Sequence, residues 1–421
     1  MTADQMSEGI EDVETFRLRA RAWLAENMPT LPAGVTNGDL QRRDEEEGGG
    51  RRMRELQKML FDGGFAGLCY PIEYGGQGLT PAHQDAFTRE TVPYEMPTGL
   101  NIPHLSILGP SLLECGTEEQ KQRYLPKLIS GEELWVQFLS EPSGGSDLAG
   151  LVTRATRDGD TFVLNGSKIW SSGAFRADYA LILARTNWDV PKHSGISVFI
   201  MKIHQPGVEV QQIKMANGPE EFCQEFFDDV PIPLENLVGE IDGGWSVASR
   251  LLFHERSAVS GASPYVSGMG FGRRASAGAT RRDLIELATE LGLAEDLETR
   301  QLVAEAHIAD LVSGQLVKRT TQNIKQGNLP PTAASIPRLF GGMSYERRSE
   351  IQLEILGRSS VAFDPRDHKE RLSLDYLVRQ GGSLGGGSLE MSRNIISERV
   401  LGMPREFAAD KDKPFNQVKH N

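Results

Sequence analysis

The stretch Trp245-Ser-Val-Ala-Ser-Arg-Leu-Leu-Phe-His-Glu-Arg-Ser-Ala-Val-Ser260 is where helical periodicity returns after a long β-rich run. It contains neither Pro nor Gly after its first residue, and side chains that can pack recur every three to four positions, at Val247, Leu251, His254 and Ala258. This spacing predicts a helix with one buried face. A carboxylate on such a helix, here Glu255, is either paired with a neighbouring cation or has a chemical role.

The chain before the β-rich run is mostly helical. Helical periodicity runs from Val13 to Leu24 and ends before Pro29, because proline cannot continue a helix. The acidic, Gly-rich run 44–50 interrupts this order. Further helices are expected over 54–61, 81–92 and 116–125, the last capped by Thr117, and a compact turn over 70–80.

Short β-rich runs replace helical periodicity from Leu134 to about Gly239. Strands are expected over 135–139, 161–164, 168–170, 179–185, 196–202, 208–213 and 222–227. Two of these runs flank Asn165-Gly166, a dipeptide that is a strong hairpin signal, so a β-turn is expected there. The middle of the chain is therefore predicted to be an all-β domain.

Helical periodicity then persists almost to residue 405. Helices are expected over 282–291, 299–326, 336–356 and 388–399, with Pro337 in a first turn. Long helices joined by modest loops predict a bundle. We therefore expect an α+β fold with an N-terminal α-helical domain (1–132), a middle β-barrel or sandwich domain (133–240), a C-terminal four-helix bundle (241–405) and a polar tail (406–421).

The amino-acid composition and charge of the chain limit the kinds of partner that we expect. The 421-residue chain is 39% hydrophobic and 24% charged, as in ordinary soluble globular proteins, and its net charge is −13. Nucleic-acid binding relies on clustered Lys and Arg, which are scattered here, so no nucleic-acid partner is expected. No apolar run approaches the ~20 residues that span a bilayer, and the acidic segment Met1–Glu8 lacks the regions of a signal peptide. Three well-separated cysteines, Cys69, Cys115 and Cys223, fit reduced thiols in a cytoplasmic protein.

The segment Gln137-Phe-Leu-Ser-Glu-Pro-Ser-Gly-Gly-Ser-Asp147 carries the richest binding signal. Its Pro and Gly residues predict a tight exposed loop whose backbone N–H groups can converge, with the hydroxyls of Ser140 and Ser146, on a planar acceptor-rich ligand or a phosphate. The alternative is a Ser/Gly turn without a ligand. Trp170-Ser-Ser172 could return to the same site with the indole as an aromatic wall, or Trp170 could be a packed core residue.

The segment Gly381-Gly-Ser-Leu-Gly-Gly-Gly-Ser-Leu-Glu390 leads directly into the last expected helix. Consecutive glycines let a backbone approach a ligand closely, and a helix N-terminus presents free N–H donors; a flexible linker is the alternative. No phosphate-binding or dinucleotide fingerprint has the required strand–turn–helix context. His104, His254 and His368 are isolated, so no metal site is expected, and the first two are expected to be packed or polar-wall residues.

Several blocks together resemble the acyl-CoA dehydrogenase family. They are Tyr70-Pro-Ile-Glu-Tyr-Gly-Gly-Gln-Gly78, Ser140-Glu-Pro-Ser-Gly-Gly-Ser-Asp-Leu-Ala149, Asn165-Gly-Ser-Lys-Ile-Trp170, Glu225-Phe-Phe-Asp-Asp-Val-Pro231 and Arg393-Asn-Ile-Ile-Ser-Glu-Arg-Val-Leu-Gly402. The blocks lie in the family's order, and the resemblance extends from about residue 10 to residue 405. The order of helical, β and helical parts is also similar to the family's fold.

The resemblance implies a flavin enzyme, with FAD as cofactor, that removes an α-proton and a β-hydride from an acyl-CoA thioester. The product would be a trans-2-enoyl-CoA, and the electrons would pass to an electron-transferring flavoprotein or a similar acceptor. Positions that match the family's flavin contacts are Gln137, Leu139, Ser140, Gly145, Ser146, Trp170 and Ser172, with further FAD contacts at Ser388 and Glu390. Ser146 and Arg256 match positions that also touch the CoA substrate.

One departure from the family concerns the catalytic base. Many members carry it in a Tyr-Glu-Gly-Thr sequence before the last helix, where this chain has Gly385-Gly-Gly-Ser388. Glu255 matches the alternative position used by members that act on branched, long or ring-bearing acyl groups, and it is the predicted base. Gly386 and Gly387 are expected to line the substrate, because a residue without a side chain leaves space for the carboxylate and its N–H can polarise the thioester carbonyl. A surface glutamate paired with Arg256 or Arg250 is the alternative.

A second departure lies between Arg281 and Glu298, where many members have an Arg and an aromatic-Gly pair that reach a neighbour's FAD pyrophosphate. No clean match is present. Either another Arg serves in a homo-oligomer, or a paralogous subunit supplies that half, as in α₂β₂ members that act on steroid side chains. A subunit that mainly completes a partner's flavin site, and a flavin oxidase or monooxygenase on the same fold, are the alternative functions.

Overall fold

The computed structural model describes residues 10–32, 35–44, 49–259, 263–265, 277–361 and 368–419, so Met1–Glu8, Ser260 and part of the run 44–50 lie outside the described residues. The chain divides into two compact units. The first contains residues 1–213, 221–272 and 409–421, and the second contains residues 214–220 and 273–408. Each unit has its own hydrophobic core.

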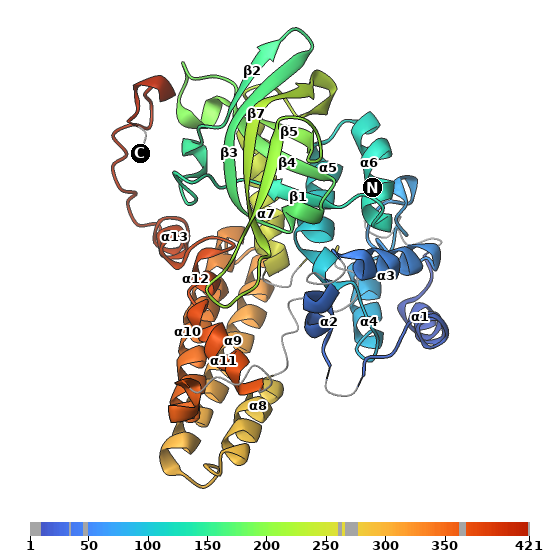
Figure 1. Cartoon of the computed structure of the whole chain (residues 1–421), viewed down its shortest axis with the longest axis vertical. Coiled ribbons are helices and arrows are strands. Elements are labelled where there is room, and N and C mark those ends of the chain that lie inside the picture. The colour runs from blue at the N-terminus through green and yellow to red at the C-terminus, as the bar shows by residue number, and fades with distance from the viewer. Residues whose placement is uncertain are drawn as a thin grey trace. The chain divides into compact units, whose positions relative to one another are not determined.

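The first unit begins with helices, as predicted (Figure 1). They are α1 (Val13–Asn27), α2 (Asn37–Arg43), α3 (Arg51–Asp62), α4 (Pro81–Glu90), α5 (Gly109–Cys115) and α6 (Glu118–Ser130), with a π-helical segment η5 (Asn101–Leu108) before α5. Side-chain caps fix their starts: Asp12 accepts the N–H of Thr15 at α1, and Thr117 accepts the N–H of Gln120 at α6. The cap predicted at Thr117 is confirmed.

The predicted compact turn after α3 is also confirmed. Tyr70 is fully buried and donates its hydroxyl to the carbonyl of Leu105 at 2.5 Å. A short 3-10 turn (Ile72–Tyr74) follows and ends at Gly75, whose φ is +87°. The turn closes so tightly that a Cβ on Gly76 would lie 2.2 Å from the carbonyl oxygen of Tyr70, so only glycine fits there.

The middle of the chain forms one 8-stranded sheet, ordered β6-β7-β3-β2-β4-β5-β8 with β1 beside β4. The strands are β1 (Trp135–Phe138), β2 (Arg154–Asp158), β3 (Thr161–Ser172), β4 (Tyr179–Arg185), β5 (Ile196–Lys202), β6 (Val208–Ile213), β7 (Phe222–Pro233) and β8 (Leu237–Val238). The bounds of β4, β5 and β6 are those predicted. Strand β4 is buried along nearly its whole length, which explains its continuous apolar run.

The hairpin predicted at Asn165-Gly166 is wrong, because both residues lie inside the continuous strand β3. Gly166 lies at a register shift between β3 and β7, where a Cβ would come within 2.8 Å of the Cα of Thr153. The Asn165 amide instead exchanges hydrogen bonds with Asp229 on β7. The actual hairpin turn joins β2 to β3 and contains Gly159, with φ +60°. The dipeptide therefore marks a β-bulge rather than a turn.

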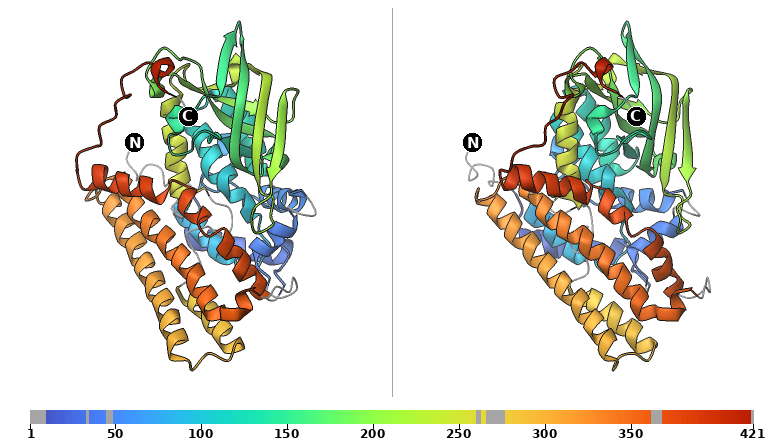
Figure 2. Two further views of the ribbon diagram at one scale, coloured as in Figure 1. Left: turned by 60° about the vertical axis from the view of Figure 1, so that its left-hand side comes forward. Right: turned by 90° about the vertical axis from the view of Figure 1, so that its left-hand side faces the viewer.

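Helix α7 (Gly244–Val259) confirms the helix predicted in the stretch that begins at Trp245. It belongs to the same compact unit as the sheet and runs alongside it (Figure 2). A Cβ on Gly244 would lie 2.7 Å from the Cα of Ser197, so a glycine at the helix start allows α7 to approach strand β5 closely. Its buried face consists of Val247, Ala248, Leu251, His254 and Ala258.

The second unit is helical, as predicted. Its helices are α8 (Ala277–Glu290), α9 (Leu297–Lys325), α10 (Ser335–Leu356), α11 (His368–Leu377), α12 (Gly381–Leu384) and α13 (Leu389–Ile395). Figure 2 shows α8, α9 and α10 packed side by side, and Leu284, Leu287 and Ile351 lie in their shared core. Neither α11 nor α12 was expected, because the first follows a short segment without clear periodicity and the second is Gly-rich.

The chain returns to the first unit after residue 408. A 3-10 turn at Phe415–Gln417 buries Phe415 and places its ring 3.5 Å from the guanidinium of Arg185. The backbone N–H groups of Phe415 and Asn416 donate to the carbonyls of Val190 and Trp188. This short C-terminal segment is therefore attached to the β-sheet domain through both backbone and side-chain contacts.

Candidate active site

Helix α7 presents Glu255 near its C-terminal end. Glu255 is half-buried, its neighbour Arg256 is exposed, and His254 is 5% exposed on the packed face of the helix. Burial lowers the pKa of His254, which fits the expected packing role. His104 is likewise buried, with one ring nitrogen 3.1 Å from the backbone nitrogen of Trp135 and the other 2.8 Å from the carbonyl of Leu128.

Glu114 on α5 fixes the turn of α7 that precedes Glu255. Its carboxylate accepts a hydrogen bond from Nε of Arg250 and lies 3.2 Å from Nε2 of His254. Arg250 and His254 are four residues apart, so both face α5 from the same side of the helix. Arg250, named in the alternative explanation of Glu255, therefore makes an ion pair with a different carboxylate.

The predicted Ser/Gly loop begins at the end of β1. Ser146, Gly144 and Gly145 are exposed, and Leu139 and Ser140 are half-buried. A Cβ on Gly144 would meet no heavy atom within 4 Å, so this glycine is not required by internal packing. Oε1 of Gln137 is buried, yet no described residue donates a hydrogen bond to it.

Trp170 and Ser172 lie beside this loop, because the N–H of Ile169 donates to the carbonyl of Ser140 at 3.0 Å. Trp170 has a φ of +67° at a register shift between β3 and β7, and its side chain is 57% exposed. The alternative in which Trp170 is a packed core residue is therefore wrong. Its indole projects outward, and the ring of Phe222 packs edge-on against it. Ser172 is also exposed.

These features fit a flavin. A planar ring system can lie against an exposed aromatic face, a ligand N–H can satisfy the buried acceptor on Gln137, and open space at Gly144 admits a ligand close to the backbone. Each of these observations lies within the first unit, where the structure brings the two predicted segments together.

The Gly-rich segment lies in the second unit. Gly386 and Gly387 have φ values of +71° and +91°, which other residues rarely adopt. Ser388 caps α13 by accepting the N–H of Met391, as a Ser before a helix should, and the exposed Glu390 forms an i,i+3 pair with Arg393. The positive φ values explain why glycine occupies these positions, whereas the approach of a substrate to their backbone and their relation to Glu255 stay predictions.

Three residues that hold these segments in place were missed. Arg338 on α10 donates to the carbonyls of Gly382 and Gly385 and so fixes the Gly-rich turn. Lys168 and Glu141 form a buried ion pair behind the Ser/Gly loop. Lys168 shares the inward parity of Phe162 and Leu164 on β3, and a lysine at an inward strand position is a signal for a buried partner.

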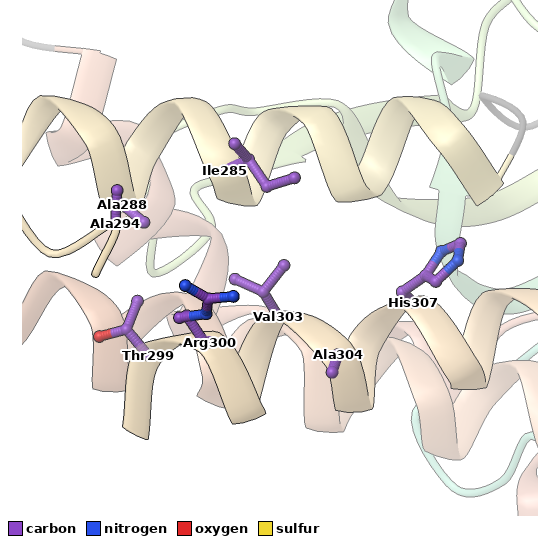
Figure 3. A pocket seen from close by; sticks show the side chains of 8 residues that line it. All are labelled: Ile285, Ala288, Ala294, Thr299, Arg300, Val303, Ala304 and His307. Carbon is purple, nitrogen blue, oxygen red and sulfur yellow. The ribbon is translucent and has the colours of Figure 1, made fainter. Parts of the chain in front are cut away.

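A separate cavity of about 450 Å³ lies between α8 and α9 of the second unit (Figure 3). It is lined by Ile285, Ala288, Ala294, Thr299, Arg300, Val303, Ala304 and His307. None of the predicted site residues lines it. Among the described residues, no group of three or more His, Cys, Asp and Glu side chains could hold a metal ion, and no helix could cross a bilayer.

Comparison with known proteins identifies a family. Residues 11–132 match the family model of the acyl-CoA dehydrogenase N-terminal domain, and residues 137–230 match that of the acyl-CoA dehydrogenase middle domain. The chain is 33% identical to acyl-CoA dehydrogenase IpdE1 of Mycobacterium tuberculosis over 94% of its length and 99% of that protein.

Two solved structures are similar over most of the chain. One, described as the Tcur3481-Tcur3483 steroid ACAD, is 31% identical, with a TM-score of 0.73 over 94% of this chain and 99% of that one. The other, the ChsE4-ChsE5 complex from Mycobacterium tuberculosis, is 29% identical, with a TM-score of 0.72 over 94% and 98%.

Proposed function

The chain belongs to the acyl-CoA dehydrogenase family, and from that premise we propose that it is an FAD-dependent enzyme with Glu255 as its catalytic base. The reaction removes the α-proton and a β-hydride from an acyl-CoA thioester and leaves the trans-2-enoyl-CoA. A ring-bearing acyl group, of the kind on a steroid side chain, is the proposed substrate class, because one similar structure is described as a steroid ACAD.

The observation that carries this proposal is the placement of Glu255 on α7. The helix is fixed at its start by Gly244 against β5 and one turn before Glu255 by Glu114, so the carboxylate is held by a rigid element. Glu255 is half-buried, and closure of an apolar substrate over it would desolvate it further. Desolvation raises the pKa of a carboxylate, which makes it a better base at neutral pH.

Gly386 and Gly387 are proposed to lie against the substrate. Because residues 385–387 are all glycine, the stretch that carries the base in many members supplies no carboxylate here. The N–H of Gly386 is proposed to donate to the thioester carbonyl, which would acidify the α-proton that Glu255 removes. Arg338 keeps this turn in place through the carbonyls of Gly382 and Gly385.

The cofactor is proposed to lie against Trp170 and the loop after β1. Gln137, Leu139, Ser140, Gly145, Ser146 and Ser172 are the other proposed contacts in the first unit, and Ser388 and Glu390 those in the second. Ser146 and Arg256 are also proposed to contact the CoA. When bound, the flavin accepts the hydride, and the chain's own residues orient it, exclude water and remove the proton.

The test compares Glu255→Gln with Glu240→Gln, a control at an exposed glutamate of the same unit. Each variant is loaded with FAD and titrated without oxygen with branched, long-chain and steroid-side-chain acyl-CoA thioesters. The Glu255→Gln variant should retain FAD but lose bleaching of the flavin band, whereas Glu240→Gln should bleach as the parent does. Normal bleaching of Glu255→Gln would remove Glu255 from the mechanism.

A second candidate function is a subunit that completes a flavin site shared with a paralogous chain. The two-protein composition named for both similar steroid and ChsE4-ChsE5 structures favours it. The proposed electron acceptor in either case is an electron-transferring flavoprotein. The mass and flavin content of the chain expressed alone decide between the two: a yellow homo-oligomer supports a self-sufficient enzyme, and a colourless chain that becomes yellow with a partner supports the shared site.

A further inference from the structure

A fully buried ion pair lies behind the proposed flavin site. Nζ of Lys168 on β3 lies 2.8 Å from Oε1 of Glu141, and the exposed fractions of the two side chains are 0% and 3%. Taking two charges out of water costs several kcal/mol each, and an apolar pair of similar volume is often as stable. Stability alone therefore gives little reason for this pair, and its contacts point to another role.

The pair ties together both ends of the Ser/Gly loop. Lys168 also donates to the carbonyl of Leu139 at 2.9 Å, at the start of the loop. Glu141 accepts the backbone N–H groups of Val152 at 2.6 Å and Thr153 at 2.9 Å, directly after it. Lys168 therefore holds the start of the loop directly and the returning chain through Glu141.

The same lysine lies two residues from Trp170 and opposite Glu225 on β7. Glu225 is fully buried and accepts a hydrogen bond from the hydroxyl of Ser171 at 3.1 Å. Trp170 thus lies in the strand between Lys168 and Ser171, and the side chains of both are anchored inside the sheet. A non-glycine residue at positive φ is strained and persists only where its surroundings fix it.

Burial and mutual contacts shift the pKa values of Lys168, Glu141 and Glu225. Burial raises the pKa of Glu225 to about 8, so this carboxyl is neutral near pH 7. The pKa of Glu141 is lowered overall, although burial acts to raise it, because the Lys168 ammonium and backbone N–H groups stabilise its charge. Burial lowers the pKa of Lys168, and the charge of Glu141 opposes that lowering.

We propose that Lys168 and Glu141 are positioning residues for the flavin. The buried pair holds the loop that starts at Leu139 in register with the outward-projecting Trp170, so that both walls of the site are set before the cofactor arrives. This inference rests on the proposed function for the identity of the ligand. The arrangement of the walls is a property of the chain itself and can be measured without flavin.

The experiment uses the full chain and three variants. The double variant Lys168→Met/Glu141→Leu removes both charges together, which avoids leaving one buried and unpaired. Glu141→Gln keeps the lysine and the volume but gives up one acceptor for a backbone N–H. Lys192→Met is the matched control, because Lys192 pairs with Asp147 at 2.6 Å on the exposed side of the same loop.

Three quantities are measured: amide hydrogen exchange at 139–153, the dissociation constant for FAD, and the visible circular dichroism of bound FAD. In the double variant, exchange at Val152 and Thr153 should accelerate, FAD should bind about tenfold more weakly, the effect of losing one charge-assisted hydrogen bond, and the flavin dichroism should change. Glu141→Gln, which leaves the buried Lys168 without its anionic partner, should shift all three in the same direction, and Lys192→Met should shift none.

Unchanged exchange and FAD affinity in the double variant would overturn the proposal. If the double variant does not fold, Glu141→Gln decides by the same criteria. If the parent chain alone binds no FAD, the self-sufficient enzyme fails, yet the exchange comparison between Glu141→Gln and Lys192→Met still decides whether the pair positions the loop.

Discussion

Oε2 of Glu114 on α5 lies 2.5 Å from Nε of Arg250 on α7. The side chains are 33% and 46% exposed, so solvent screens this ion pair. Its importance lies in its location, because the same carboxylate also lies 3.2 Å from Nε2 of His254, the residue before the proposed base. A contact that adds little to global stability can therefore fix the orientation of the helix that carries the chemistry.

Replacement of Glu114 with Ala should accordingly separate stability from catalysis. The free energy of unfolding should fall by no more than ~1 kcal/mol, as for other exposed pairs. The rate of flavin reduction should fall about tenfold, because small misplacements of a base are costly. Urea denaturation and anaerobic stopped-flow measure the two effects, with Lys58→Met, which breaks an exposed i,i+4 pair on α3, as control. An unchanged reduction rate would contradict the role of this contact.

Glu114 should also contribute to acid sensitivity. The hydrogen bond from Arg250 lowers the pKa of Glu114 below its ordinary value of 4.5, so its contribution to stability is present above that pH. The contribution is lost as pH falls through the lowered pKa. The difference in unfolding free energy between the parent and Glu114→Ala should therefore shrink on acidification below about pH 4.5. A difference that stays constant down to acid unfolding would rule this linkage out.

The exposed indole of Trp170 should matter for the cofactor and little for folding. Trp170→Ala removes a side chain that is 57% exposed, so the unfolding free energy of the flavin-free chain should change by less than about 1 kcal/mol. FAD affinity should fall about tenfold, as expected for loss of an aromatic contact, and Trp170→Phe should recover most of it. Equilibrium dialysis against FAD gives the affinities. Equal FAD affinity in the parent and Trp170→Ala would place the flavin elsewhere.

Two glycines offer a matched test of packing. Gly76→Ala would place a Cβ 2.2 Å from a backbone carbonyl and should lower the unfolding free energy by about 1–3 kcal/mol. Gly144→Ala meets no atom within 4 Å and should be neutral within about 0.5 kcal/mol. Thermal and urea unfolding of the flavin-free chains measure both. A large loss at Gly144 would contradict the open space around this glycine.

Glu225 should give the folded chain an unusual pH profile. Its pKa is raised by burial to about 8, from an ordinary value of 4.5, so between these values the folded chain holds a proton that the unfolded chain has lost. Its contribution to stability is therefore largest below pH 4.5 and declines as pH rises toward 8. Glu225→Gln cannot titrate, so the parent should lose stability relative to this variant between about pH 5 and pH 8. Parallel profiles would show that Glu225 is already ionised.

Most of the fold could be predicted because its signals are local. Strand β4 is a continuous apolar run, and α9 and α10 carry long helical periodicity, so their position in the chain is evident from neighbouring residues. Asn165-Gly166 misled because local turn chemistry also serves a bulge, and the deciding contact is with Thr153, directly before β2. A local sequence pattern carries no information about a contact with a residue from another part of the chain.

The candidate site was predictable in its residue types and not in its supports. The loop after β1 and Trp170 were expected to meet, and they do, through Ile169 and Ser140. The ion pair of Lys168 and Glu141 was missed because its partners lie on different segments, and a charged residue gives no direct sign of being buried. The residue type indicates which side chains can bind a ligand. Burial in the folded chain decides which other side chains support those ligand-binding residues.

The contact between Arg185 and Phe415 has a consequence for the order of folding. Arg185 donates to the carbonyls of Ala149 and Leu151, directly after the proposed flavin loop, and Phe415 covers its guanidinium. The neighbouring bond between Asn416 and Asp189 spans 227 positions of sequence. Contacts of such long range form late, since a large chain entropy must be lost first. The Phe415 segment is therefore expected to dock after the β-sheet has formed, so the cofactor loop gains its outer support last and FAD uptake should lag behind the formation of the sheet.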